Sequence, residues 1–301
     1  MLCAMTPNFD FSEAAVAELA RVDAARALQE DVGAGDLTAG LIDPARRATA
    51  RVLAREAAVI CGAPWAQAAL QQLDPEVRLT WHVQEGQRCA PDQVVLEMQG
   101  SARALLTAER TALNFLQLLS AVATKTADYV AAVNGVPAAQ GGRRRAQIVD
   151  TRKTLPGLRL AQKYAVRTGG GTNHRIGLYD AVLIKENHIA AAGGVRAVLQ
   201  SAAVVAPTAK FVEIEVETLA QLSEALDAGA RMVLLDNMSL AQLREAVQLN
   251  AGRAILEVSG GVNMATVRDI AATGVDRISI GALTKDVQAI DFSMRFSADL
   301  T

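Results

Sequence analysis

Residues 148–189 read IVDTRKTLPGLRLAQKYAVRTGGGTNHRIGLYDAVLIKENHI, a stretch in which basic residues alternate with glycines and short apolar runs. Ten Lys or Arg residues lie between Arg143 and Lys185, against only Asp150 and Asp180. The whole chain carries 30 basic and 32 acidic residues, so this excess of positive charge is local. A solvated helix face, the common explanation of a charge run, would lack the glycines and the apolar runs. The stretch therefore indicates a site that binds a small anion.

The same stretch begins the rhythm that decides the fold class. Helical patterns separate six short apolar runs, which are IVDT, AVLIKEN, FVEIEVE, MVLLDN, AILEVSG and RISIGA. Alternating strands and helices predict parallel strands joined by right-handed crossovers. No GxGxxG motif follows the first run, which disfavours a dinucleotide-binding open sheet. The late sequence GVDRISIGALTK is similar to the last phosphate-binding turns of a barrel, although an open sheet remains possible.

The chain before residue 148 has a different organisation. Residues 12–30 predict a helix that Gly33 and Gly35 end, and residues 48–98 predict short strands. Residues 101–133 predict one long helix or two shorter ones, and the Gly-, Gln- and Arg-rich residues 134–147 predict an exposed loop. A helix followed by short strands indicates an α+β domain in this part of the chain.

Composition excludes several classes of protein. A net charge of −2 argues against a general nucleic-acid binder. The sequence has no run of 18 apolar residues that would span a membrane, and residues 1–16 lack the pattern of a signal peptide. The three cysteines show neither metal-ligand spacing nor an even count, so we expect a reducing, cytoplasmic environment.

Each of the six apolar runs finishes in charged residues or in glycine. In a parallel barrel the carboxyl ends of the strands converge on one mouth, and that mouth is the catalytic face. The residues at these ends, in chain order, are Arg152 and Lys153, Lys185, Glu215, Asp236, Ser259 with Gly260 and Gly261, and Gly281. Six such endings in succession predict an active site at the mouth.

The residue types at the mouth indicate which groups they bind. Glycine turns that precede helices let backbone N–H groups approach a phosphate, or else they are only tight turns. The carboxylates of Glu215 and Asp236 suit a shared Mg²⁺ or sugar hydroxyls, with structural ion pairs to Lys185 or Arg152 as the alternative. Arginine and lysine suit carboxylates and phosphates. His174, which follows Gly169-Gly170-Gly171 and precedes Arg175, is interpreted as facing the ligand.

These residues also carry a family resemblance. The stretch 150–189 resembles the signature of the quinolinate phosphoribosyltransferase family, also called carboxylating nicotinate-nucleotide pyrophosphorylase. Further similar motifs are DVGAGDLTA (31–39), ERTALNFLQ (109–117), EIEVET (213–218), LLDNMS (234–239), EVSGGV (257–262) and DRISIGALT (276–284). The resemblance covers nearly the whole chain, and the loop around Gly135–Gln147 looks longer than the family usually needs.

The resemblance implies a fold, a division into domains and a reaction. The fold is an N-terminal α/β sandwich domain over residues 1–122, followed by an incomplete α/β barrel with fewer than eight strands over 123–285. Residues 286–301 would pack back on the N-terminal domain. The reaction joins quinolinate to phosphoribosyl pyrophosphate in the presence of Mg²⁺, and it yields nicotinate mononucleotide, pyrophosphate and CO₂ for NAD biosynthesis.

Motif positions imply a role for each site residue. The residues that would bind the quinolinate carboxylates are Arg152, His174 and Arg175. Lys153 and Lys185 would contact the phosphoribosyl donor and the carboxylate region of quinolinate. Glu215 and Asp236 would hold the ribose hydroxyls and the metal. Those that would cradle the 5′-phosphate are Ser259, Gly260, Gly261 and Gly281. In a homodimer, Arg110 would reach the quinolinate pocket of the neighbouring subunit.

Three alternatives stay open at this point. A barrel with a lysine at a strand end is also typical of Schiff-base aldolases and lyases, in which Lys185 would be the nucleophile. A close relative of the same family would use another pyridine or serve metal transport. A binding homologue without catalysis is the third alternative, and the full set of charged strand ends argues against it.

Overall fold

A computed structural model describes residues 9–136 and 145–297 of the chain. The described residues form two compact units that interleave along the sequence. The antiparallel-sheet unit contains residues 9–125, 155–169 and those from 286 onward, and the parallel-sheet unit contains residues 126–136, 145–154 and 170–285. The predicted loop at 134–147 lies largely outside the described residues. Both the α/β class and the parallel arrangement of the second half are confirmed.

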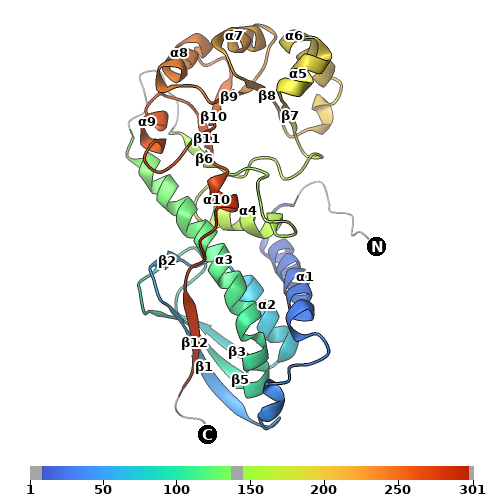
Figure 1. Ribbon diagram of the computed structural model, residues 1–301, viewed down its shortest axis with the longest axis vertical. Coiled ribbons are helices and arrows are strands. Elements are labelled where there is room, and N and C mark those ends of the chain that lie inside the picture. Colours follow the sequence, from blue (N-terminus) through green and yellow to red (C-terminus); the bar gives the residue numbers. More distant parts are fainter. Residues whose placement is uncertain (1–8, 137–144, 298–301) are drawn as a thin grey trace. The chain divides into compact units, whose positions relative to one another are not determined.

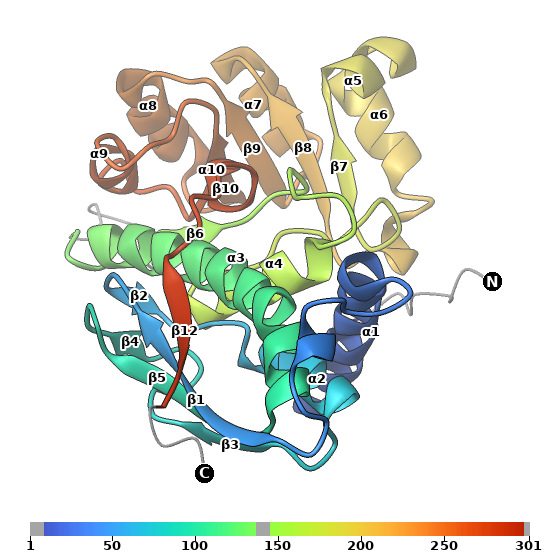
Figure 2. The same ribbon diagram turned by 60° about the horizontal axis from the view of Figure 1, so that its bottom comes forward.

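The antiparallel-sheet unit is built on a four-stranded sheet in the order β12-β1-β5-β3. Its elements are α1 (Glu13–Val32), η1 (Ala39–Leu41), β1 (Arg47–Ala54), β2 (Ala58–Val59), α2 (Ala63–Leu73), β3 (Arg78–Trp81), β4 (Arg88–Cys89), β5 (Val94–Ser101), α4 (Arg159–Thr168) and β12 (Phe292–Phe296), together with most of α3 (Ala102–Asn134). Side chains of α1, α2 and α3 share one hydrophobic core with the sheet, and Figure 2 shows these helices beside it.

Local sequence explains most of these elements. The side chain of Ser12 accepts a hydrogen bond from the Ala15 amide and starts α1, and Gly33, at φ 55°, ends it. Buried and accessible residues alternate along β1, as expected for a strand with one face in the core. The strand-like segments at 48–60 and 77–89 flank α2, a helix that the sequence pattern did not predict. Gly62, at φ 106°, begins this helix, and Trp65 and Leu70 bury its inner side.

The long helix predicted after Ser101 is one helix of 33 residues, α3. It runs without a break through the predicted domain boundary at residues 122 and 123, and that boundary stays a prediction. Near the C-terminus, β12 pairs antiparallel with β1, with Val52 opposite Met294.

The parallel-sheet unit contains a six-stranded sheet in the order β6-β11-β10-β9-β8-β7, and every neighbouring pair is parallel. Its elements are β6 (Gln147–Val149), β7 (Val182–Ile184), α5 (Glu186–Ala192), α6 (Val195–Ala202), η2 (Ala206–Thr208), β8 (Val212–Val216), α7 (Leu219–Asp227), β9 (Met232–Asp236), α8 (Leu240–Asn250), β10 (Ile255–Ser259), α9 (Val267–Ala271), β11 (Arg277–Ser279) and α10 (Ala282–Lys285). Each of the six predicted apolar runs contains one of these strands. Figure 1 shows α5 to α9 around the sheet.

Capping side chains begin several of these helices. Thr218 and Gln221 form a capping box at α7, and Ser239 and Gln242 form another at α8. The strand pattern did not predict α5, which begins directly after Lys185. There the Lys185 backbone amide donates to Nδ1 of His188 at 2.9 Å.

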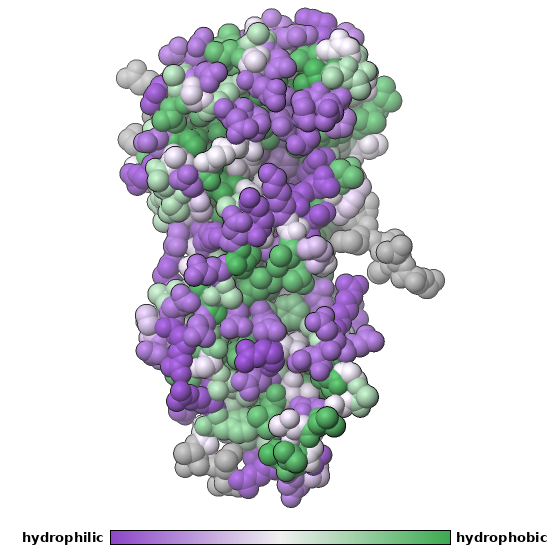
Figure 3. Space-filling view, in the orientation of Figure 1, coloured by the Kyte–Doolittle hydropathy of each residue, from purple (hydrophilic) through white to green (hydrophobic). Residues whose placement is uncertain are grey.

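Hydrophilic side chains predominate on the face of the molecule in Figure 3, with hydrophobic ones interspersed among them. Within residues 9–136 and 145–297, no helix combines the length and the apolarity needed to cross a membrane.

Candidate active site

The parallel sheet brings two predicted carboxylates and a predicted lysine to its carboxyl edge. Glu215 lies near the end of β8, Asp236 ends the neighbouring strand β9, and Lys185 directly follows β7 on the other side of β8. Nζ of Lys185 lies 3.3 Å from Oε2 of Glu215. Burial raises the pKa of Glu215, Lys185 lowers it, and the nearby charge of Asp236 raises it. The two carboxylates therefore repel each other, a repulsion that a cation or donor hydroxyls would relieve.

The glycine-containing turns lie at the same edge. A Cβ atom at Gly260, whose φ is +95°, would lie 2.1 Å from Oδ1 of Asn237, so only glycine fits there. The backbone amide of Asn237 donates to the carbonyl of Ser259, which holds the β9 and β10 ends together. Asn237 was not predicted as a site residue, although it follows Asp236 at φ 53°, a backbone conformation in which asparagine is favoured.

Gly281 makes room for Lys153. A Cβ atom at Gly281 would lie 3.1 Å from Cδ of Lys153, so the lysine stem passes directly over this glycine. The expectation that a helix N-terminus follows each glycine turn is confirmed at Gly281, where α10 begins at Ala282, and was wrong at Gly261. The helix after Gly261 begins only at Val267, and the helix after Gly281 has four residues. Backbone amides and the Lys153 ammonium, rather than a helix dipole, are the groups available to an anion here.

Arg152 and Arg175 form a pair of guanidinium groups. Nε of Arg152 is buried without a hydrogen-bond partner among the described residues. The pKa of Arg175 is lowered mainly by burial and next by the charge of Arg152, so the two cations lie within electrostatic range. A buried donor without a partner costs free energy, on the order of 1–3 kcal/mol. Two adjacent cations with an unused donor are well suited to an anion with two carboxylates.

His174 lies inside the unit, with a residue exposure of 8%. Its Nε2 lies 2.8 Å from Oε2 of Glu213, and its Nδ1 accepts the backbone amide of Arg175 at 2.8 Å. Its own amide donates to Oδ1 of Asp150 at 2.8 Å. Both ring nitrogens therefore have protein partners, and the substrate contact of His174 stays a prediction.

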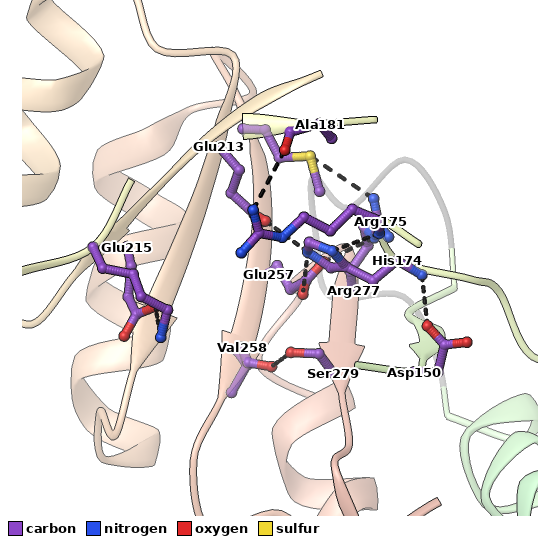
Figure 4. A network of polar contacts seen from close by, with 12 residues as sticks. Asp150, His174, Arg175, Ala181, Glu213, Glu215, Glu257, Val258, Arg277 and Ser279 are labelled. Atoms are coloured by element: carbon purple, nitrogen blue, oxygen red, sulfur yellow. Dashed lines mark hydrogen bonds and ion pairs between the residues drawn. The ribbon is translucent and has the colours of Figure 1, made fainter. Parts of the chain in front are cut away.

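Three residues close to His174 were not predicted. Glu213 on β8 and Glu257 on β10 are fully buried, and Nε of Arg277 on β11 lies 3.0 Å from Oε2 of Glu257 (Figure 4). Burial is the main cause that raises the pKa of Glu213 to about 7 and that of Glu257 to about 7. The alternation in FVEIEVE, where Glu213 and Glu215 share one face, was the signal in the sequence.

The buried carboxyl of Glu257 predicts how the folding stability of the protein depends on pH. Its pKa of about 7 in the folded chain exceeds the ordinary 4.5, so between these values the folded state binds more protons than the unfolded state. The stabilising contribution is present at low pH and is lost as pH rises through about 7. We expect the fall in Tm between pH 5 and 8 to be smaller in Glu257→Gln than in the wild type. Calorimetric melting measures this, and an unchanged slope would contradict the assignment. Exposed Glu245→Gln is the control.

Arg110 lies on α3 in the antiparallel-sheet unit, and it is exposed. It is not among the residues that the parallel sheet brings together, and its predicted role requires a second subunit.

Comparison with known proteins agrees with this geometry. The family model described as "Quinolinate phosphoribosyl transferase, C-terminal domain" matches residues 122–295, and the corresponding N-terminal domain matches residues 36–120. The nicotinate-nucleotide pyrophosphorylase [carboxylating] of Mycobacterium leprae is 41% identical over 284 residues, which cover 92% of this chain and 97% of that relative. A probable enzyme of the same name from Bacillus subtilis is 38% identical and covers 88% of this chain and 89% of its own length.

Solved structures are similar over the same range. The nicotinate-nucleotide pyrophosphorylase from Francisella tularensis has a TM-score of 0.87 at 41% identity, and the match covers 93% of this chain and 97% of that one. The enzyme of the same name from Ehrlichia chaffeensis has a TM-score of 0.84 at 34% identity, covering 96% of this chain and all of that one, 100%.

Proposed function

This chain belongs to the quinolinate phosphoribosyltransferase family, and we propose that it makes nicotinate mononucleotide for NAD biosynthesis. It transfers the phosphoribosyl group of phosphoribosyl pyrophosphate to quinolinate and releases pyrophosphate and CO₂. The single observation that carries this proposal is the Arg152–Arg175 pair with its unused buried donor. Quinolinate has two adjacent carboxylates, and each guanidinium offers a fork of donors that matches one of them.

The donor binds along the other strand ends. Lys153, which passes over Gly281, contacts the pyrophosphate region of the donor. Backbone amides near Ser259, Gly260 and Gly261 cradle the 5′-phosphate because these positions admit close approach. Glu215 and Asp236 accept hydrogen bonds from the ribose hydroxyls. Lys185 pairs with Glu215 and meets the acceptor carboxylate, so it lies between the two substrates.

Glu215 and Asp236 also suit Mg²⁺. Their oxygens are the hard ligands that this ion prefers, and the repulsion between the two carboxylates favours a cation between them. When bound, Mg²⁺ neutralises charge on the pyrophosphate that leaves.

The site residues support a reaction in two stages, which are substitution at the anomeric carbon and then loss of CO₂. The anomeric carbon becomes cationic as the bond to pyrophosphate breaks, and the carboxylate of Glu215 stabilises that charge. The quinolinate nitrogen forms the new bond to this carbon. Loss of CO₂ leaves an electron pair on the ring carbon beside the alkylated nitrogen, which stabilises it until a proton from solvent replaces CO₂. Holding both anionic substrates in line accounts for much of the rate.

We further propose a homodimer in which Arg110 completes the acceptor pocket of the partner subunit. An exposed arginine on α3 suits this role because a two-fold axis makes such a contact twice. We also propose that the protein is cytoplasmic, as its cysteine content predicts.

The Schiff-base alternative is disfavoured by the geometry of Lys185. A Schiff-base lysine attacks with a free amine, whereas Nζ of Lys185 is engaged in an ion pair 3.3 Å from Oε2 of Glu215. The ion pair is typical of an electrostatic role.

Product analysis with two acceptors tests the proposed function. We expect quinolinate to yield nicotinate mononucleotide and CO₂, with a kcat/KM at least about 100-fold above that for nicotinate, because nicotinate leaves one buried guanidinium without a carboxylate. The measurement is chromatography of the nucleotide with release of labelled CO₂. Equal turnover of nicotinate would reject the decarboxylating reaction.

A further inference from the structure

A buried polar layer lies beneath the strand-end residues. Its members are the buried residues Glu213, Glu257 and His174 and the half-buried Arg277 (Figure 4). Glu213 precedes Glu215 by two residues on β8, so both side chains leave the same face of the sheet, and Glu213 lies about 7 Å deeper. Glu257 has the same relation to Ser259 on β10. The layer therefore lies directly behind the groups assigned to the substrates.

The hydrogen bonds of His174 determine its protonation. Nδ1 accepts the Arg175 amide, so it carries no proton. Nε2 must then carry the proton of the neutral ring, and it donates this proton to Oε2 of Glu213 at 2.8 Å. The Arg175 amide thus donates to His174, and His174 donates to Glu213, whose Oε2 lies nearer to Nε2 than Oε1 of Glu257 at 3.4 Å.

This order argues against a metal ion in the layer, although Nε2 of His174 and oxygens of Glu213 and Glu257 lie within 4.8 Å of one another. A histidine that ligates a metal uses a nitrogen without a proton, and here Nε2 holds the proton because Nδ1 is already an acceptor. Nε of Arg277 also lies 3.0 Å from Oε2 of Glu257, and a divalent ion would add charge beside this cation.

This order of donors begins at Arg175, which is itself a predicted substrate contact. Its backbone amide is held by His174, and its Nη1 donates to the carbonyl of Ala181 at 3.4 Å. The charge of Glu213 stabilises the Arg175 guanidinium, which burial and the neighbouring Arg152 destabilise. Glu213 thus acts on Arg175 twice, through His174 and through its own charge.

We propose that Glu213 is a positioning residue that holds Arg175 in the orientation required by the second carboxylate of the acceptor, with His174 as the link between them. This inference rests on the proposed function, since it takes the acceptor to be a pyridine dicarboxylate. A guanidinium binds a carboxylate with two parallel hydrogen bonds only when its plane is correctly turned. Residues behind the contact supply that orientation.

Two substitutions separate the two effects of Glu213. Glu213→Leu removes both the acceptor for His174 and the charge, and Glu213→Gln keeps an oxygen that accepts from Nε2 but removes the charge. Glu245→Gln, an exposed carboxylate on α8, is the matched control. The dissociation constants of quinolinate and of phosphoribosyl pyrophosphate are measured separately by calorimetry on the full chain.

We expect Glu213→Leu to weaken quinolinate binding by at least about 10-fold and to change donor binding less than about 2-fold. Glu213→Gln should recover most of the loss, to within about 3-fold of the wild type. Unchanged quinolinate binding in Glu213→Leu, or an equal loss for both substrates, would overturn the positioning role. A wild type that binds no quinolinate would instead refute the proposed function.

Loss of one partner of a buried pair is strongly destabilising, so Glu213→Leu requires a companion measurement. Nitrogen NMR of the His174 ring in the wild type supplies it. We expect Nε2 protonated and Nδ1 unprotonated throughout pH 6–8, with the same tautomer in Glu213→Gln. A proton on Nδ1 in the wild type would contradict the proposed order of donors whether or not Glu213→Leu folds.

Discussion

Arg152→Ala is expected to lower kcat/KM for quinolinate by at least about 100-fold while the fold is retained. Nε of Arg152 is a buried donor without a partner among the described residues, and the charge of Arg152 adds to burial in lowering the pKa of Arg175. A charge-assisted bond at such a site contributes about 2–3 kcal/mol, and each 1.4 kcal/mol corresponds to a factor of about ten. Removal of one repelling cation should also leave the free protein no less stable. Steady-state kinetics with saturating donor, together with circular dichroism, measures both effects.

Arg244→Ala is the control for this change. Arg244 is an exposed arginine on α8 of the same unit, and its loss should change kcat/KM less than about 2-fold. Near-normal activity of a folded Arg152→Ala protein would show that the strand-end residues do not form the acceptor site.

Arg110→Ala and Lys153→Ala proteins are each expected to be nearly inactive alone and to regain activity when mixed. If Arg110 serves the partner's site and Lys153 serves its own, a hybrid dimer has one site with both residues intact. Random re-pairing of equal amounts makes half of the dimers hybrids, each with one good site of two. The mixture should then show about a quarter of wild-type activity. Activity is measured after subunit exchange, which labelled subunits confirm.

A control mixture accompanies this experiment. Arg152→Ala mixed with Lys153→Ala should stay inactive, because both residues belong to the same site of the same subunit. No recovery for the Arg110→Ala mixture, despite confirmed exchange, would mean that Arg110 acts within its own chain or does not act. Recovery of activity in the Arg152→Ala and Lys153→Ala mixture would contradict the division of roles.

The order of the strands along the chain was readable from local pattern alone. β8 and β9 lie within the predicted runs FVEIEVE and MVLLDN, because apolar residues bounded by charged ones favour a buried parallel strand wherever they occur. The charged or glycine ending of each run likewise needed no tertiary information. The absence of α2 from the prediction has a local reason too. Half of its buried residues are alanine, and a window that contains Pro64 is easily taken for a break between strands, although proline is well tolerated in the first turn of a helix.

The charges inside the strands were not readable in the same way. The alternation in FVEIEVE places Glu213 on the face of Glu215, but nothing near Glu213 in the sequence indicates that it is fully buried or with which residue it pairs. Its partner His174 is 39 residues earlier in the chain, and Glu257 lies on another strand. The fit of Lys153 over Gly281 likewise joins residues more than a hundred positions apart.

The sequence by itself therefore determined the α/β class, the six parallel strands and the set of residues at their carboxyl ends, because these depend on residues a few positions apart. Only the tertiary structure decided that His174 turns both ring nitrogens toward the protein, and that Glu213, Glu257 and Arg277 form a layer behind the site. The physical reason is that desolvation and charge pairing act over a few ångströms in space. Distance along the chain does not report which side chains come that close once the sheet is assembled.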